Sequence, residues 1–144
     1  MFATKDDMVK RFGEKEVRQL TDRNYTGAID DQVLATGLSD ADAEVCGYLA
    51  GRYTLPLVVT PRLLVGYACD IARYRLTGTD VQCTPDIETR YQQAIKYLGH
   101  VTNGTISLGV DAAGAPVDGK VGTSKSARTS AGGRRFNADT MAGY

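Results

Sequence analysis

Residues 60–76 read TPRLLVGYACDIARYRL, and this stretch decides the fold. Thr60 followed by Pro61 is a strong helix start, because threonine caps a helix N-terminus and the fixed φ of proline suits the first helical position. The apolar side chains that follow occupy almost every side of the predicted helix, which runs to about Leu76. A helix that is apolar nearly all round is buried among its neighbours. The sequence therefore predicts a helix that is central in the fold or buried against neighbouring elements.

The residues before this helix carry three further helix signals. Thr4 and the acidic residue three positions later have the spacing of a capping box, and Gly13 is typical of a C-terminal stop, so a short helix is predicted between them. Two more helices are predicted over about 30–37 and 39–52, with Gly37 ending the first and a second capping pattern opening the next.

Prolines shape the chain after residue 52. Residues 53–59 are largely apolar but cannot form a regular helix, because Pro56 lies inside them and Pro61 follows, so they are predicted to be an extended, largely buried linker. The pair Thr84-Pro85 repeats the start signal and predicts a last helix that ends near residues 99–104. The fold class predicted is all-α, a small helical bundle of about four to five helices.

The composition changes near residue 103. Leu, Ile, Val and Phe make up 25 of the first 102 residues but six of the last 42, which also hold half of the sixteen glycines. A segment with so few large apolar residues does not bury a core of its own. We therefore expect a helical domain over 1–102 and a long, glycine-rich, extended C-terminal tail over 103–144. Ile106, Leu108 and Val110 alternate with small or polar residues, which is the period of one short strand.

Composition also argues against several classes of function. Seventeen basic and seventeen acidic residues cancel, so no overall field draws the chain to nucleic acid or to a membrane. The sequence has no run of about 18 apolar residues and no signal-peptide pattern at its N-terminus. Three widely spaced cysteines and a single histidine predict neither a disulfide framework nor a metal site. The glycine-rich stretch 109–122 lacks the Lys-Ser/Thr ending of a phosphate loop, and no cofactor is expected.

Asp70, Arg73 and Arg75 lie on the largely apolar central helix, where charge is least expected. Asp70 and Arg73 are three residues apart and can meet on one helical face. One interpretation is a catalytic carboxylate held by an arginine, but acid–base catalysis needs a second titrating group, and none is identifiable. The favoured interpretation is an ion pair that fixes helix packing or reaches another subunit. The sequence therefore predicts no catalytic residues and no enzyme.

The tail offers candidate contacts with a partner. The strand-like residues Ile106, Leu108 and Val110 could pair with the exposed sheet edge of a neighbouring protein. Further along, basic and aromatic character combine in Arg134, Arg135 and Phe136, and the chain ends at Tyr144. With Arg128, these arginines would also suit the phosphates of single-stranded nucleic acid. Because the whole tail carries five basic and three acidic residues, an anchor on a protein surface is the favoured interpretation.

Several long stretches resemble one known family. They are Lys5-Asp6-Asp7 with Arg11-Phe12-Gly13-Glu14-Lys15-Glu16, then Leu20-Thr21-Asp22-Arg23, Gly47-Tyr48-Leu49-Ala50-Gly51-Arg52-Tyr53-Thr54-Leu55-Pro56-Leu57 and Cys69-Asp70-Ile71-Ala72-Arg73-Tyr74-Arg75-Leu76. Together they resemble a virion protein family of Mu-like bacteriophages and prophages. The resemblance covers roughly residues 2–109.

This resemblance implies a head-completion or head–tail connector (adaptor) protein in the neck of the virion, assembled in the bacterial host cytoplasm. Similar small helical adaptors form a homo-oligomeric ring, commonly of twelve copies, under the portal protein. The ring extends the DNA channel, with DNA only as cargo, and docks the next neck or tail component. A nucleic-acid-binding accessory protein, or a stopper or tail terminator of the same virion, are the alternative functions.

Overall fold

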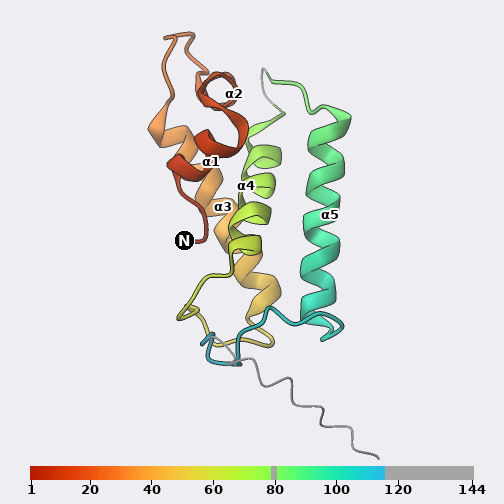
Figure 1. Cartoon of the computed structure of the whole chain (residues 1–144). Helices are drawn as coiled ribbons and strands as arrows, with labels where there is room; N and C mark the ends of the chain where they lie inside the picture. The colour runs from red at the N-terminus through yellow and green to blue at the C-terminus, as the bar shows by residue number, and fades with distance from the viewer. Residues whose placement is uncertain (79–80, 116–144) are drawn as a thin grey trace, which may run out of the picture.

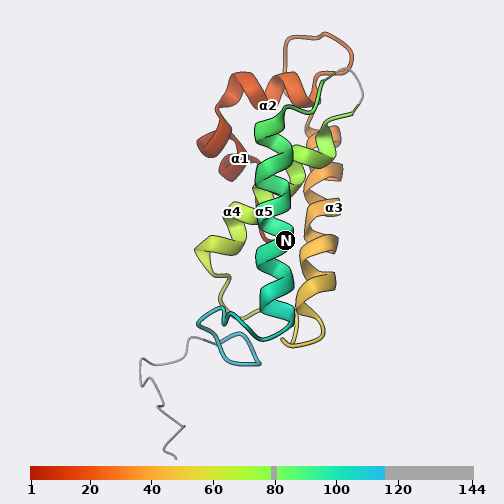
Figure 2. The ribbon, with the colours of Figure 1, turned by 90° about the vertical axis from the view of Figure 1, so that its right-hand side faces the viewer.

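A computed structural model describes residues 1–78 and 81–115, and within them the chain forms five α-helices. These are α1 (Lys5–Phe12), α2 (Glu14–Thr21), α3 (Asp31–Leu49), α4 (Arg62–Leu76) and α5 (Pro85–Thr102). The protein is thus a small all-α protein, which confirms the predicted fold class. The long helices α3, α4 and α5 lie side by side, and α1 and α2 cover one end of this bundle (Figure 1, Figure 2).

The central position predicted for the helix at 60–76 is confirmed, because α4 packs against each of the other four helices. Its side chains at Leu64, Ile71 and Leu76 are buried almost completely. The helix begins one residue later than predicted, since Pro61 takes the N-cap position and Thr60 makes no side-chain cap bond. The same signal works as predicted at α5, where the Thr84 hydroxyl accepts a hydrogen bond from the Ile87 amide and Pro85 follows.

Gly37 does not end a helix, so the prediction of two helices over 30–37 and 39–52 was wrong. A single helix, α3, runs from Asp31 through this glycine to Leu49. The reason is packing: a Cβ atom added at Gly37 would lie 2.7 Å from Cγ of Leu76. The glycine therefore marks a close contact between α3 and α4, and this tertiary contact outweighs its weak helix propensity.

The helix α2 was not predicted. It follows α1 directly, with Gly13 between them at a φ of 86°, a conformation that glycine adopts without strain. The capping box at Thr4 and the end of α1 at Gly13 are confirmed. The buried residues of α2 follow helical spacing: Val17, Leu20 and Thr21. In a helix of only eight residues, this periodicity is too short to give a clear signal in the sequence.

Residues 103–115 fold back along the end of the bundle that carries the connection between α3 and α4, at the bottom of Figure 1. We call this end the base. Leu108 and Val110 belong to the core, at 9% and 8% exposed, and the Tyr53 hydroxyl accepts a hydrogen bond from the Leu108 amide. Two further hydrogen bonds join this segment to the α3–α4 connection, from the Thr54 amide to the Ala112 carbonyl (2.7 Å) and from the Val59 amide to the Gly114 carbonyl (3.0 Å).

This arrangement corrects the expectation for the start of the tail. Residues 106–110 form no regular strand. Leu108 and Val110 pack inside their own chain, where the base of the bundle supplies an apolar surface for them. Ile106 is half-buried against the same core. The candidates Arg128, Arg134, Arg135, Phe136 and Tyr144 lie outside the described residues.

Gly37→Ala tests the close approach of α3 and α4. The added methyl group overlaps buried Leu76, at a cost of about 1–3 kcal/mol, while the better helix propensity of alanine returns about 1 kcal/mol. We expect a net loss of up to about 2 kcal/mol in the free energy of unfolding, measured by urea denaturation followed by circular dichroism.

Gly47→Ala is the matched control, since Gly47 lies in the same helix, is exposed, and has no atom within 4 Å of an added Cβ. This change should raise stability by up to about 1 kcal/mol. Equal effects at the two glycines would show that Leu76 moves aside without cost.

Candidate functional site

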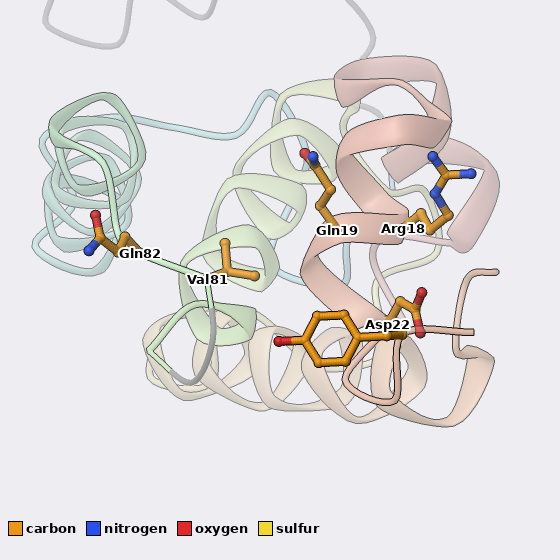
Figure 3. A pocket seen from close by; sticks show the side chains of 6 residues that line it. Arg18, Gln19, Asp22, Val81 and Gln82 are labelled. Atoms are coloured by element: carbon orange, nitrogen blue, oxygen red, sulfur yellow. The ribbon is translucent and has the colours of Figure 1, made fainter. Parts of the chain in front are cut away.

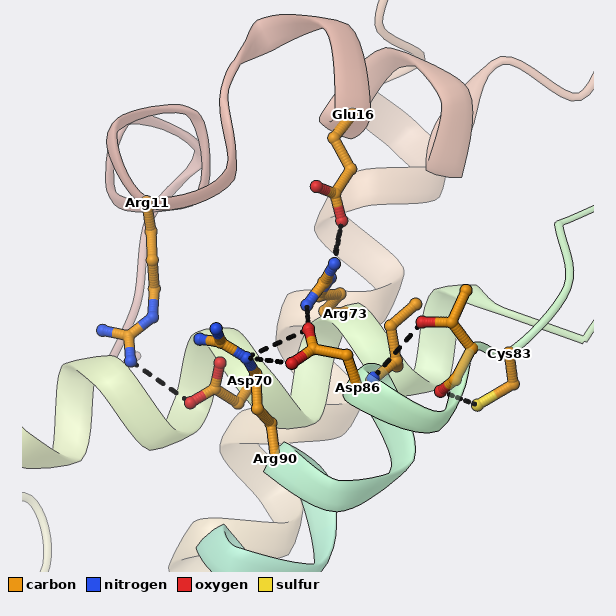
Figure 4. A network of polar contacts seen from close by, with 9 residues as sticks. Arg11, Glu16, Asp70, Arg73, Cys83, Asp86 and Arg90 are labelled. Carbon is orange, nitrogen blue, oxygen red and sulfur yellow. Dashed lines mark hydrogen bonds and ion pairs between the residues drawn. The ribbon is translucent and has the colours of Figure 1, made fainter.

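Asp70 and Arg73 of α4 belong to a network of polar contacts that joins this helix to its neighbours (Figure 4). Asp70 pairs with Arg11 of α1, with 3.2 Å between Nη2 and Oδ2, rather than with Arg73 on its own helix. Arg11 reaches it by lying across Gly66, where an added Cβ would be 2.7 Å from Nη1 of the arginine. The glycine in α4 therefore provides the room for this ion pair.

Asp70 is the one charged side chain classed as buried among the described residues, at 5% exposed. Burial raises the pKa of its carboxyl above the ordinary value, and Arg11 acts in the opposite direction. Its Oδ1 atom has no hydrogen-bond partner in the part of the chain that the structure describes. The other charges that act on it are Arg90 and Arg73. Arginine does not exchange protons near neutral pH, so these neighbours cannot act as the second group of an acid–base pair.

Arg73 joins three helices through its planar guanidinium group. Nε donates to Glu16 of α2 at 2.6 Å, and Nη1 donates to Asp86 of α5 at 3.1 Å. The guanidinium also lies over the ring of Phe12, with 4.7 Å from Cζ to the ring centroid. Asp86 in turn accepts a hydrogen bond from Arg90. Such a multiply bonded arginine fixes how α2 and α5 sit on α4.

Arg75 makes the corresponding connection to α3. Its Nη2 and Nε donate to one carboxylate oxygen of Glu44, at 2.7 and 3.2 Å, and the Tyr91 hydroxyl of α5 donates to the other at 3.0 Å. Tyr74 stacks on Tyr91 with ring centroids 4.0 Å apart. Within the described residues, the candidates Asp70, Arg73 and Arg75 thus each pair with another helix of the same chain.

A groove with an exposed aromatic residue lies at the end of the bundle opposite the base. Two hollows of about 440 and 490 Å³ share Gln19, Val81 and Gln82 and run between α2 and the residues that lead into α5. Figure 3 shows the first of them. At its rim stands Tyr25, 81% exposed and at a φ of 56°, which is uncommon for a residue with a side chain.

The loop that carries Tyr25 is held in place by Asp22. Its carboxylate accepts hydrogen bonds from the amides of Thr26 (2.7 Å) and Gly27 (2.6 Å), and these bonds hold the pKa of Asp22 below its ordinary value. A tyrosine fixed in a strained conformation and left in solvent is typical of a contact residue. The aspartate–glycine spacing around the loop was the sequence signal that could have revealed it.

A second exposed surface lies at the base, in the connection that was predicted to be largely buried. Leu55 and Leu57 do pack against the core, but Val58 is 72% and Val59 45% exposed. We call the exposed set the basal patch; it consists of Pro56, Val58, Val59 and Leu63. The prediction was therefore correct for the inward side chains and wrong for the outward ones.

No group of three or more His, Cys, Asp or Glu side chains in residues 1–78 and 81–115 is placed to hold a metal ion. None of the helices described is long and apolar enough to cross a membrane. The three cysteines are free thiols, and burial raises the pKa of Cys69 to about 12.

Comparison with known proteins agrees with the sequence resemblance. Residues 2–125 match the family described as Bacteriophage Mu, Gp36. Gene product J of Escherichia phage Mu is 34% identical over 111 residues, which cover 76% of this chain and 77% of that protein. The Mu-like prophage FluMu protein gp36 of Haemophilus influenzae is 32% identical over 110 residues, again 76% of this chain and 77% of the relative.

Arg11→Met tests whether Arg11 compensates the buried charge of Asp70. Leaving a buried carboxylate unpaired should lower the free energy of unfolding at pH 7 by about 3 kcal/mol. The folded-state pKa of Asp70 then rises further above its unfolded value. Such a carboxyl destabilises the folded state increasingly as pH rises from its unfolded-state pKa to its higher folded-state pKa. The loss of stability should therefore be smaller at pH 5 than at pH 7.

Urea denaturation at the two pH values measures this difference. Adding Asp70→Asn to Arg11→Met should recover much of the loss at pH 7 and remove its pH dependence. Lys10→Met is the control, because Lys10 of the same helix pairs with Asp6 in solvent and should change stability by less than about 0.5 kcal/mol. A loss that is equal at both pH values, or that Asp70→Asn does not recover, would contradict the assignment.

Proposed function

Because this chain belongs to the bacteriophage Mu Gp36 family, we propose that it is a structural virion protein, a head–tail connector (adaptor). It forms a homo-oligomeric ring beneath the portal protein, with twelve copies as the expected number. The ring extends the DNA channel, through which DNA passes only as cargo, and docks a stopper or tail-terminator protein. Its place is the neck of the virion, assembled in the bacterial host cytoplasm, and it has no catalytic role.

The observation that carries this proposal is the pair of contact surfaces at the two ends of the bundle. The connection between α2 and α3 lies at one end and the connection between α3 and α4 at the other (Figure 1). The first presents Tyr25 beside a groove, and the second presents the basal patch. A protein that joins different partners, or its own copies in a ring, needs two different surfaces on one body.

The network on α4 supports the same interpretation. Each of the three charged candidates holds another helix of the chain in place. A body tied at several points keeps its two end surfaces at a fixed separation, as a spacer between other proteins requires. The ion pairs of α4 therefore serve to make the helical bundle rigid, and they need no catalytic role to explain them.

The C-terminal residues 116–144 are proposed to anchor the subunit on its partners. These 29 residues reach roughly 95 Å when extended, at about 3.3 Å each. By comparison, α3 with its 19 residues is about 28 Å long. Arg134, Arg135, Phe136 and Tyr144 supply the charged and aromatic groups for such contacts.

Truncation after residue 115 tests the anchoring role. The shortened chain keeps Leu108 and Val110 in its core, so it should be folded, with a helical circular dichroism spectrum and melting temperature close to those of the full chain. We expect it to be lost from purified phage particles when it replaces the full chain in producing cells, with particle-bound protein measured by immunoblot.

A second truncation after residue 102 is the comparison variant. It should be markedly less stable, because it removes Leu108 and Val110 from the core. Normal incorporation of the chain that ends at 115 would contradict the anchoring role. Full-length protein found in isolated tails but not in heads would instead favour a tail-terminator position.

A further inference from the structure

The basal patch exposes apolar side chains on a backbone that is held firmly. The Thr54 and Val59 amides are bonded to the carbonyls of Ala112 and Gly114. Gly114 lies so close that an added Cβ would be 2.9 Å from the Leu57 Cα atom. Leu55 and Leu57 anchor the stretch from inside. A partner that binds here therefore meets a preformed surface and loses little free energy in ordering it.

The patch adjoins a hollow of about 460 Å³. Pro56 of the patch lines it together with the other residues of its wall: Met1, Phe2, Asp42, Cys46, Leu55, Leu57 and Thr60. Met1 is itself 74% exposed. Of the five large apolar side chains exposed in the described residues, four lie in or beside this area: Met1, Val58, Val59 and Leu63. Such a concentration of apolar groups marks a binding site for an apolar segment of protein.

The position at which the described chain ends identifies the occupant. Residue 115 directly follows Gly114, whose carbonyl is bonded to Val59 of the patch. The chain then continues for another 29 residues, in which Phe136 and Met141 are the largest apolar side chains before the terminal tyrosine. Phe136 is 21 residues beyond residue 115, which corresponds to roughly 70 Å of extended chain.

We propose that the basal patch binds residues 116–144 of a neighbouring copy of this chain, with Phe136 as the main apolar contact. The inference rests on the proposed function, since a ring brings the base of one subunit near the C-terminal segment of the next. The reach of the segment exceeds the length of its own bundle, and the contact joins two different surfaces. A contact of this kind repeats from subunit to subunit until the ring closes.

A photoreactive residue at position 136 tests the proposal in the full-length chain. Phe136→p-benzoylphenylalanine is produced in cells that make phage particles, which are then irradiated. We expect covalent dimers and higher multimers on a denaturing gel, with the linked peptide containing residues 56–63. A cross-link within one chain leaves it at monomer mass, and a cross-link to another protein gives a product of different mass; either result, or no cross-link, overturns the proposal.

Two double variants sharpen the result. Val58→Ser with Val59→Ser should reduce the interchain product roughly tenfold or more, because two apolar contacts are lost. Both valines are exposed, so the melting curve should not change. Gln92→Ser with Gln93→Ser, at two exposed positions of α5, should leave the product as it was. Equal cross-linking in the two double variants would exclude the basal patch as the binding surface.

Incorporation into particles is measured separately in the same cells. If the full chain enters particles and position 136 does not link to the patch, the inference fails and the connector role stands. If the chain is absent from particles, the connector role fails, whereas the cross-link still shows whether the patch binds a second copy.

Discussion

Enclosure of α4 by the other four helices is the constraint on which the rest of the structure depends. A charge on an enclosed helix is stable only if another group compensates it, because removal from water disfavours the ionised form. Asp70 and Arg73 satisfy this condition by pairing with α1, α2 and α5, while Arg75, which is exposed, pairs with Glu44 of α3. Glycines complete the arrangement: Gly37 admits Leu76, and Gly66 admits Arg11.

Elements with local signals were predictable from the sequence, and elements that depend on distant residues were not. The caps at Thr4 and Thr84 act within three residues, so α1 and α5 begin where the pattern indicates. The ion pair of Asp70 joins residues 59 positions apart, and the partner of Gly37 lies at the far end of another helix. Spacing along one helix shows only which side chains can meet on that helix. It therefore suggested Arg73 as the partner of Asp70, whereas the actual partner, Arg11, lies on another helix.

The contact surfaces show the same division. An apolar run such as residues 55–59 indicates burial in a sequence, but the return of residues 112–114 decides which side chains face inward. The exposure of Tyr25 likewise follows from the loop that Asp22 holds through hydrogen bonds to the Thr26 and Gly27 amides. None of these residues individually forms a distinctive motif in the sequence. The two surfaces proposed to bind partners were therefore the features that sequence patterns revealed least.

The pairing of residues 53–59 with 103–115 also sets an order of events during synthesis. No stretch of chain that ends before residue 110 contains the whole core, because Leu108 and Val110 close the base from the C-terminal side. On the ribosome, which delivers the N-terminus first, α1 to α5 emerge before the groups that seal them. The base becomes a finished surface only when the subunit is almost complete, so unfinished chains lack the platform that we propose a neighbouring copy recognises.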